Sequence, residues 1–149
     1  MTIHSSSVIH PDAELARGVT VGPFTTIGSD VRIGEGTIVG PNVLIEAGTV
    51  IGKNCEIFHG ASLGGEPQIL NIKNVPATVE IGDGTVIREY VTIHRSGNEN
   101  GVTRVGKGCL LMAYSHLGHD CEIGDQVVIV NSTSLAGHVI VEDRVFISA

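Results

Sequence analysis

The sequence predicts an all-β fold in which short parallel strands wind into a triangular prism, and three regularities indicate it. Counting in steps of six from Ile3 to Ile147 gives 25 positions, of which 24 are aliphatic and one is Glu99. The residue two places before each of these positions is usually small or β-branched. Glycine often follows the aliphatic residue, as at Gly22, Gly28, Gly34, Gly40, Gly52, Gly64, Gly82, Gly106, Gly118 and Gly124.

A period of six residues fits neither an α-helix nor a plain hairpin sheet. It fits a short strand followed by a corner, because residues i−2 and i lie on the same face of a strand. Glycine adopts the unusual dihedral angles of a tight corner at little cost. Three strands and three corners make a coil of about 18 residues, and successive coils pair as parallel strands about 4.8 Å apart. Residues 1–149 are therefore expected to form a single β-helix domain of about eight coils.

The composition argues against several classes of protein. The formal net charge is −7 and no basic cluster occurs, so nucleic-acid binding is not expected. The N-terminus lacks the pattern of a signal peptide, and no apolar run reaches the roughly 20 residues of a membrane span. We therefore expect a soluble cytoplasmic protein. Cys55, Cys109 and Cys121 all lie two places before an aliphatic position, so reduced and buried core thiols are expected.

Two segments interrupt the regular pattern. Residues 65–78 include Pro67, Pro76 and a polar run, and residues 95–103 include a stretch of serine, glycine, asparagine and glutamate. Proline and polar residues of this kind are typical of loops, so we expect both segments to leave the coil. Insertions in a repeat protein usually mark its functional face.

Histidines cluster near the end of the chain. Leu117 and Leu135 are separated by three steps of the repeat, which is one full coil, so they occupy the same side of adjacent coils. His119 follows Leu117 by two residues and His138 follows Leu135 by three, which places both on one corner, one coil apart. His116 precedes Leu117 directly and points outward from the same strand. One edge of the prism therefore carries three imidazoles.

This edge has the chemical groups needed for acyl transfer. A neutral imidazole is the usual general base for the attack of a hydroxyl group. Asp120, directly after His119, can fix the tautomer of that imidazole and stabilise its cation. A backbone N–H at Gly137, beside His138, can donate to a developing oxyanion. Solvated corner residues without a role are the alternative interpretation.

Three imidazoles could also bind zinc. Carbonic anhydrases built from hexapeptide repeats hold zinc with histidines of two subunits, and their later histidine pair has a spacing of five residues. His116 and His119 are only three residues apart, so no metal site is expected.

Three segments resemble the signatures of the UDP-N-acetylglucosamine acyltransferase family, which catalyses the first step of lipid A synthesis. They are Ile87–Arg95, Leu111–Cys121 and Leu135–Val139. The resemblance extends over essentially the whole chain and implies a left-handed β-helix. It implies transfer of a (3-hydroxy)acyl chain from acyl carrier protein to the 3-hydroxyl or 3-amino group of a UDP-linked glucosamine. It also implies a homotrimer, with active sites between subunits and no cofactor.

The resemblance assigns roles to individual residues. His119 is expected to be the general base, and Asp120 is expected to orient it. The amide of Gly137 is expected to stabilise the oxyanion, and His116 and His138 are expected to bind substrate.

The first loop contains a further expected substrate-binding residue, Gln68, which matches a family position near the sugar nucleotide. The aspartate and lysine usual nearby are replaced by Ile69 and Asn71, which puts the sugar or nucleotide preference in question.

Family members continue into a C-terminal helical domain that is expected to be absent here. Two alternatives follow: a truncated or engineered β-helix trimer without turnover, and a related sugar acyltransferase that uses coenzyme A.

Overall fold

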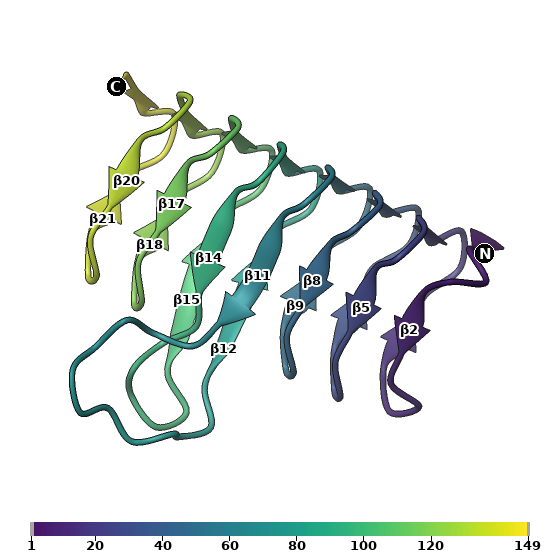
Figure 1. Ribbon diagram of the computed structural model, residues 1–149. Helices are drawn as coiled ribbons and strands as arrows, with labels where there is room; N and C mark the ends of the chain where they lie inside the picture. Colours follow the sequence, from purple (N-terminus) through teal and green to yellow (C-terminus); the bar gives the residue numbers. More distant parts are fainter. Residues whose placement is uncertain (1, 149) are drawn as a thin grey trace.

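The computed structural model describes residues 2–148, so Met1 and Ala149, the ends of the expected domain, lie outside it. All regular structure in this range is β, in 22 short strands and three parallel sheets. Figure 1 shows the coils stacked along one axis, with the two termini at opposite ends. Among the described residues, no helix is long and apolar enough to cross a membrane.

Each sheet takes every third strand along the chain. The first sheet contains β1 (Thr2–Ile3), β4 (Thr20–Val21), β7 (Ile38–Val39), β10 (Glu56–Ile57), β13 (Val86–Ile87), β16 (Leu110–Leu111), β19 (Val128–Ile129) and β22 (Phe146–Ile147). The second sheet contains β2 (Val8–Ile9), β5 (Thr26–Ile27), β8 (Leu44–Ile45), β11 (Ser62–Gly65), β14 (Thr92–His94), β17 (His116–Leu117) and β20 (Ser134–Leu135). The third sheet contains β3 (Glu14–Leu15), β6 (Arg32–Ile33), β9 (Val50–Ile51), β12 (Thr78–Ile81), β15 (Val102–Val105), β18 (Glu122–Ile123) and β21 (Ile140–Val141).

Most coils contain three steps of the six-residue repeat, as the sequence predicts: Ile3 pairs with Val21, and Leu111 pairs with Ile129. Two coils are longer. Ile57 pairs with Ile87, five steps further along the chain, and Ile87 pairs with Leu111, four steps further along. The first longer coil therefore gains two whole steps and the second gains one. Because both additions are whole steps, the six-residue count stays in phase across the two interruptions.

The inward side chains form the core that the repeat predicts. From Val21 to Ile129 the aliphatic positions on the strands are almost completely buried, and Leu63, Ile93 and Leu117 have no exposed surface. Burying an aliphatic side chain of this size contributes roughly 1.5–3 kcal/mol, and stacking repeats this contribution in every coil. The three cysteines are buried and free, which confirms their prediction as core residues: Cys55, Cys109 and Cys121.

Buried threonines fill many of the remaining inward positions, and the hydroxyl groups of Thr25, Thr37 and Thr85 join successive coils. The Thr25 hydroxyl donates to the Gly40 carbonyl at 2.7 Å and accepts from the Val43 amide at 3.1 Å. Such paired contacts satisfy a polar group inside an apolar core.

A column of glycines lines the corner that follows the third sheet. At Gly82, an added Cβ atom would lie 2.6 Å from the backbone of Gly106 in the next coil. Glycine therefore lets the backbones approach at the spacing that parallel pairing requires. The same position is glycine in five successive coils: Gly34, Gly52, Gly82, Gly106 and Gly124.

Two loops leave the prism in the segments where the sequence predicts excursions. Residues 66–77 connect β11 to β12, and residues 95–101 connect β14 to β15. Both loops project from the same edge of the prism (Figure 1), and the Asn100 amide donates to the Pro76 carbonyl at 2.6 Å. The loops therefore form one layer beside the histidines.

Candidate active site

A histidine–aspartate pair lies at the corner after β17. His119 Nδ1 and Asp120 Oδ2 are 2.7 Å apart, and both side chains are largely buried. One coil further on, the His138 ring lies perpendicular to the His119 ring, with centroids 5.0 Å apart. His138 Nε2 is 3.8 Å from Asp120 Oδ2. The structure therefore brings together the three residues that the regular coil places on one corner.

Asp120 is the best-connected side chain at this corner. Its Oδ1 atom accepts from the Ser96 hydroxyl and from Asn98 Nδ2, and its Oδ2 atom accepts from the Gly97 amide at 3.1 Å. Burial alone would raise the pKa of the Asp120 carboxyl, but these donors and His119 outweigh it and hold that pKa well below its usual value.

The ionised Asp120 carboxylate can only accept hydrogen bonds, so the proton of the His119 contact lies on Nδ1. The unshared pair of Nε2 is then free to take a proton from a bound molecule. An added Cβ atom at Gly137 would lie 2.4 Å from Nε2, so the backbone of Gly137 lies directly against this atom. Among residues 2–148, no protein group accepts a hydrogen bond from the Gly137 N–H.

A groove of about 380 Å³ opens beside this pair. Four of the expected site residues line it: Gln68, His116, His119 and Gly137. His138 and Asp120 do not line the groove: Asp120 lies behind His119, and the His138 side chain is 66% exposed on the outer side of the pair. The other lining residues are His94, Gly118, Ser134, Leu135 and Ala136.

His94 and His116 lie side by side in the lining of the groove. Their rings meet edge to face with centroids 4.8 Å apart, and His116 Nδ1 lies 2.7 Å from the Thr92 hydroxyl. Burial lowers the pKa of both imidazoles. The pKa of His94 is lowered further because a positive charge on His94 would be repelled by charge on His116, His119 and Arg95. Both rings therefore favour the neutral form.

This burial predicts a pH-dependent stability. In the unfolded chain, His94 and His116 take up protons near pH 6.5, but the folded chain resists the same protonation. The free energy of unfolding should therefore fall as the pH drops below about 6.5. Urea unfolding at pH 7.5 and pH 5.5 measures this loss. A double His94→Gln, His116→Gln variant should lose less stability over that interval, and an unchanged slope would contradict the prediction.

The same corner contains three potential metal ligands. His119, Asp120 and His138 could each offer a ligand atom within 4.8 Å of the others. Both Asp120 oxygens, however, already accept two hydrogen bonds each, and one of them holds His119. His116 is outside this group, so the trio of imidazoles that would suggest zinc is not assembled. The donors around Asp120 suit an orienting carboxylate better than a metal ligand.

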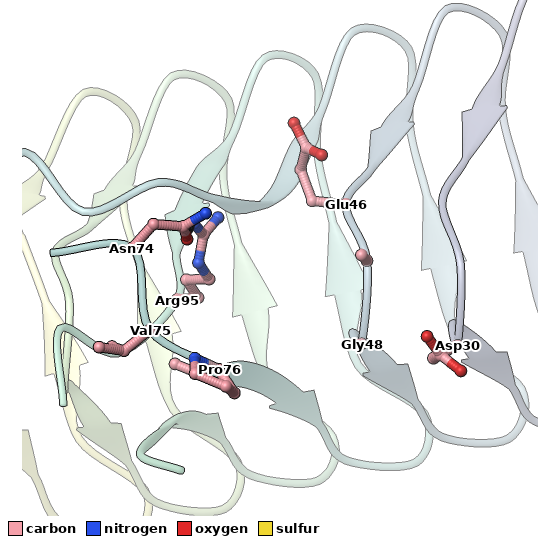
Figure 2. Close-up of a pocket in the computed structure, with 9 residues that line it drawn as sticks. Asp30, Glu46, Gly48, Asn74, Val75, Pro76 and Arg95 are labelled. Carbon is pink, nitrogen blue, oxygen red and sulfur yellow. Dashed lines mark hydrogen bonds between the residues drawn. The ribbon is translucent and has the colours of Figure 1, made fainter. Parts of the chain in front are cut away.

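A second pocket of about 500 Å³ lies under the first loop, on the side away from His119. Figure 2 shows Arg95 and Asn74 beside each other, with Glu46 and Asp30 on neighbouring coils. The Arg95 guanidinium donates to Asn74 Oδ1 at 3.1 Å and to the Gly64 carbonyl at 3.3 Å. Arg95 therefore holds the loop against the coil, and this pocket carries no comparable reactive pair.

Comparisons with known proteins agree with this architecture. The bacterial transferase hexapeptide family (six repeats) matches residues 30–65 and 103–137. The acyl-[acyl-carrier-protein]–UDP-N-acetylglucosamine O-acyltransferase of Alkalilimnicola ehrlichii is 59% identical over 143 residues, which are 95% of this chain and 55% of that protein. The chain matches the N-terminal β-helix portion of the UDP-N-acetylglucosamine O-acyltransferases.

Solved structures of these acyltransferases give the same result. LpxA from Acinetobacter baumannii has a TM-score of 0.95 at 39% identity, covering 98% of this chain and 57% of that one. The UDP-N-acetylglucosamine acyltransferase of Francisella novicida has a TM-score of 0.90 at 42% identity, and the match covers 97% of this chain and 55% of that one. The fold is therefore the predicted left-handed parallel β-helix. The chain spans about half the length of the acyltransferases that it matches.

The structure brings several residues to the site that the sequence alone does not place there. His94 lies beside His116 because Thr92 pairs with His116, four steps of the repeat further along the chain, rather than with the residue three steps away. Ser96, Gly97 and Asn98 reach Asp120 only through the folded loop 95–101. The extra step in that coil is the feature of the sequence that could have predicted His94 beside His116 in the groove.

Proposed function

We propose that this chain carries the catalytic β-helix of an acyltransferase. It moves a 3-hydroxyacyl chain from acyl carrier protein to the 3-position of a UDP-linked N-acetylglucosamine-type sugar, as in the first step of lipid A synthesis. The acyl carrier protein and the sugar nucleotide are those in the names of its relatives. The observation that carries the proposal is the His119–Asp120 pair, which presents Nε2 to a groove next to the free N–H of Gly137.

The reaction needs no enzyme nucleophile. His119 Nε2 takes the proton of the acceptor hydroxyl group while its oxygen forms a bond to the thioester carbonyl carbon. The Gly137 N–H donates to the oxyanion that develops there. When the oxyanion collapses, the carbon–sulfur bond breaks, and the thiolate of the carrier protein takes the proton from His119. Asp120 stays ionised throughout and stabilises the imidazolium.

Substrate contacts are proposed from both sides of this pair. His116 and Gln68 line the groove and are suited to hold the sugar nucleotide. His138 stands exposed beside Asp120, where it can contact substrate from the outer side. A role for Gln68 in the loop agrees with the position of functional insertions in solenoid proteins.

The proposal includes a homotrimer in the cytoplasm. The outer face of the first sheet supports self-association, because beyond Glu56 it carries an unbroken line of apolar residues. These are Val86, Leu110, Val128 and Phe146, and Phe146 is 65% exposed. Exposed apolar surfaces of this kind usually mark an interaction site.

The direct test is acyl transfer from 3-hydroxyacyl carrier protein to UDP-N-acetylglucosamine, followed by mass spectrometry of the sugar nucleotide. The expected product carries one ester-linked acyl chain. A UDP-sugar with a 3-amino group serves as the competing acceptor, and acyl coenzyme A serves as the competing donor.

The outcomes separate the alternatives. Transfer only from acyl coenzyme A would favour another sugar acyltransferase built on hexapeptide repeats. No transfer from either donor, with a folded trimer in sedimentation, would favour a scaffold without turnover. Activity that depends on added zinc and is lost with a chelator would contradict the metal-free mechanism.

A further inference from the structure

We propose that Ser96 is a positioning residue that locks Asp120 as an acceptor, so that His119 presents Nε2 to the groove. The effect on catalysis rests on the proposed function. The contacts between Ser96 and Asp120 are independent of that function. Loop 95–101 therefore acts as part of the active site although none of its side chains lines the groove.

The Ser96 hydroxyl group can donate its hydrogen to one acceptor only. Ser96 is completely buried, and its Oγ accepts a hydrogen bond from the Asn98 amide at 3.0 Å. The hydroxyl hydrogen is then left to donate to Asp120 Oδ1. A buried hydroxyl group that contacts a carboxylate makes one of the stronger hydrogen bonds available to a protein.

The rest of the loop holds this serine in place. An added Cβ atom at Gly101 would lie 2.0 Å from Ser96 Oγ, so only glycine leaves room for the hydroxyl group. At Gly97, an added Cβ atom would lie 2.7 Å from the Ile69 side chain and 3.3 Å from that of Ile72. The first loop thus covers the second with apolar side chains, close to Asp120.

The donors divide the two oxygens of Asp120 between separate tasks. Oδ1 is held by Ser96 and Asn98, and Oδ2 is left for His119 and the Gly97 amide. The carboxylate cannot rotate about its own axis without breaking contacts on both sides. The orientation of the His119 ring is therefore fixed from behind, by a loop that is inserted between β14 and β15.

Among the described residues, histidines are the only side chains that can place a positive charge within ion-pair distance of Asp120. His119 and His138 lie within ion-pair distance of Asp120, and His94 is close enough to His119 to feel its charge. Loss of the Ser96 donor makes the carboxylate a stronger base. It should then hold the Nδ1 proton of His119 more tightly.

The test compares Ser96→Ala and Asn98→Ala with Thr37→Val. Asn98 is exposed, so its variant tests the same carboxylate without risk to the fold. Thr37 is a matched control, because its buried hydroxyl group also both donates, to Gly52, and accepts, from Cys55, on a distant coil. The readouts are the NMR chemical shift of the His119 Nδ1 proton, which reports its contact with Asp120, and the pH profile of kcat and of KM.

We expect Ser96→Ala to shift the NMR signal of the His119 Nδ1 proton and to lower kcat by roughly tenfold, as for a hydrogen bond to a charged group. KM should change little, and Asn98→Ala should move both quantities in the same direction by less. Thr37→Val should change neither. An Nδ1 proton signal and a kcat that match the control in both variants would overturn the proposal. If the wild type transfers no acyl group, the proposed function fails, and the NMR signal of the Nδ1 proton alone decides the role of Ser96.

Discussion

His119→Ala is expected to lower kcat by roughly 10²- to 10⁴-fold, the usual contribution of a general base. Without the imidazole, no group in the groove has both a free ring nitrogen and an ionised carboxylate behind it. The fold should persist, because the His119 side chain is outside the aliphatic core and is 19% exposed. Steady-state acyl transfer, with circular dichroism as the check on folding, measures the effect.

A second substitution separates the base from its hydrogen bond. His119→Asn keeps a side-chain N–H that can donate to Asp120 but has no basic nitrogen. It should therefore be as inactive as His119→Ala if proton transfer is the role of this residue. His10→Ala, an exposed histidine on the first coil, is the control. Activity within a few-fold of wild type in His119→Asn would rule out His119 as the base.

The fold could be predicted almost completely from the sequence because each coil repeats the same local rule. Every inward position is occupied by an aliphatic, small or β-branched residue, so the period of six appears without knowledge of distant contacts. Even Glu99, the exception among the six-residue positions, marks a real departure, because it lies in loop 95–101. The prediction of about eight coils is close to the seven complete turns and the strand β22 that are observed.

The site could be predicted only where the coil is regular. His119 and His138 follow Leu117 and Leu135, which pair at the regular spacing of one coil, so simple arithmetic places them together. Ser96 and Asn98 reach Asp120 through a loop that has no periodic rule. Loop conformation depends on contacts such as those of Gly97 with Ile69, which join segments that no repeat relates.

Gly106→Ala is expected to destabilise the protein by roughly 1–3 kcal/mol, the cost of overpacking, and toward the upper end of that range. The added Cβ atom would lie 2.4 Å from the carbonyl oxygen and 2.5 Å from the carbonyl carbon of Gly124. These are backbone atoms of the next coil, and they cannot move aside as a side chain can. Gly106 also donates to the Ile123 carbonyl at 2.8 Å, so separating the coils would weaken the pairing itself.

Gly84 is the matched control, because it lies on a corner with open space around it. An added Cβ atom there meets nothing within 4 Å, but its φ of +67° is costly for most other residues. Asparagine tolerates this region and already occupies such corners at Asn42 and Asn54. Gly84→Asn should therefore be nearly neutral, and Gly84→Ala should cost about 1 kcal/mol. Urea unfolding of the three variants then separates strain at a corner from collision between coils, and equal losses for Gly106→Ala and Gly84→Ala would show that the backbone spacing does not require glycine.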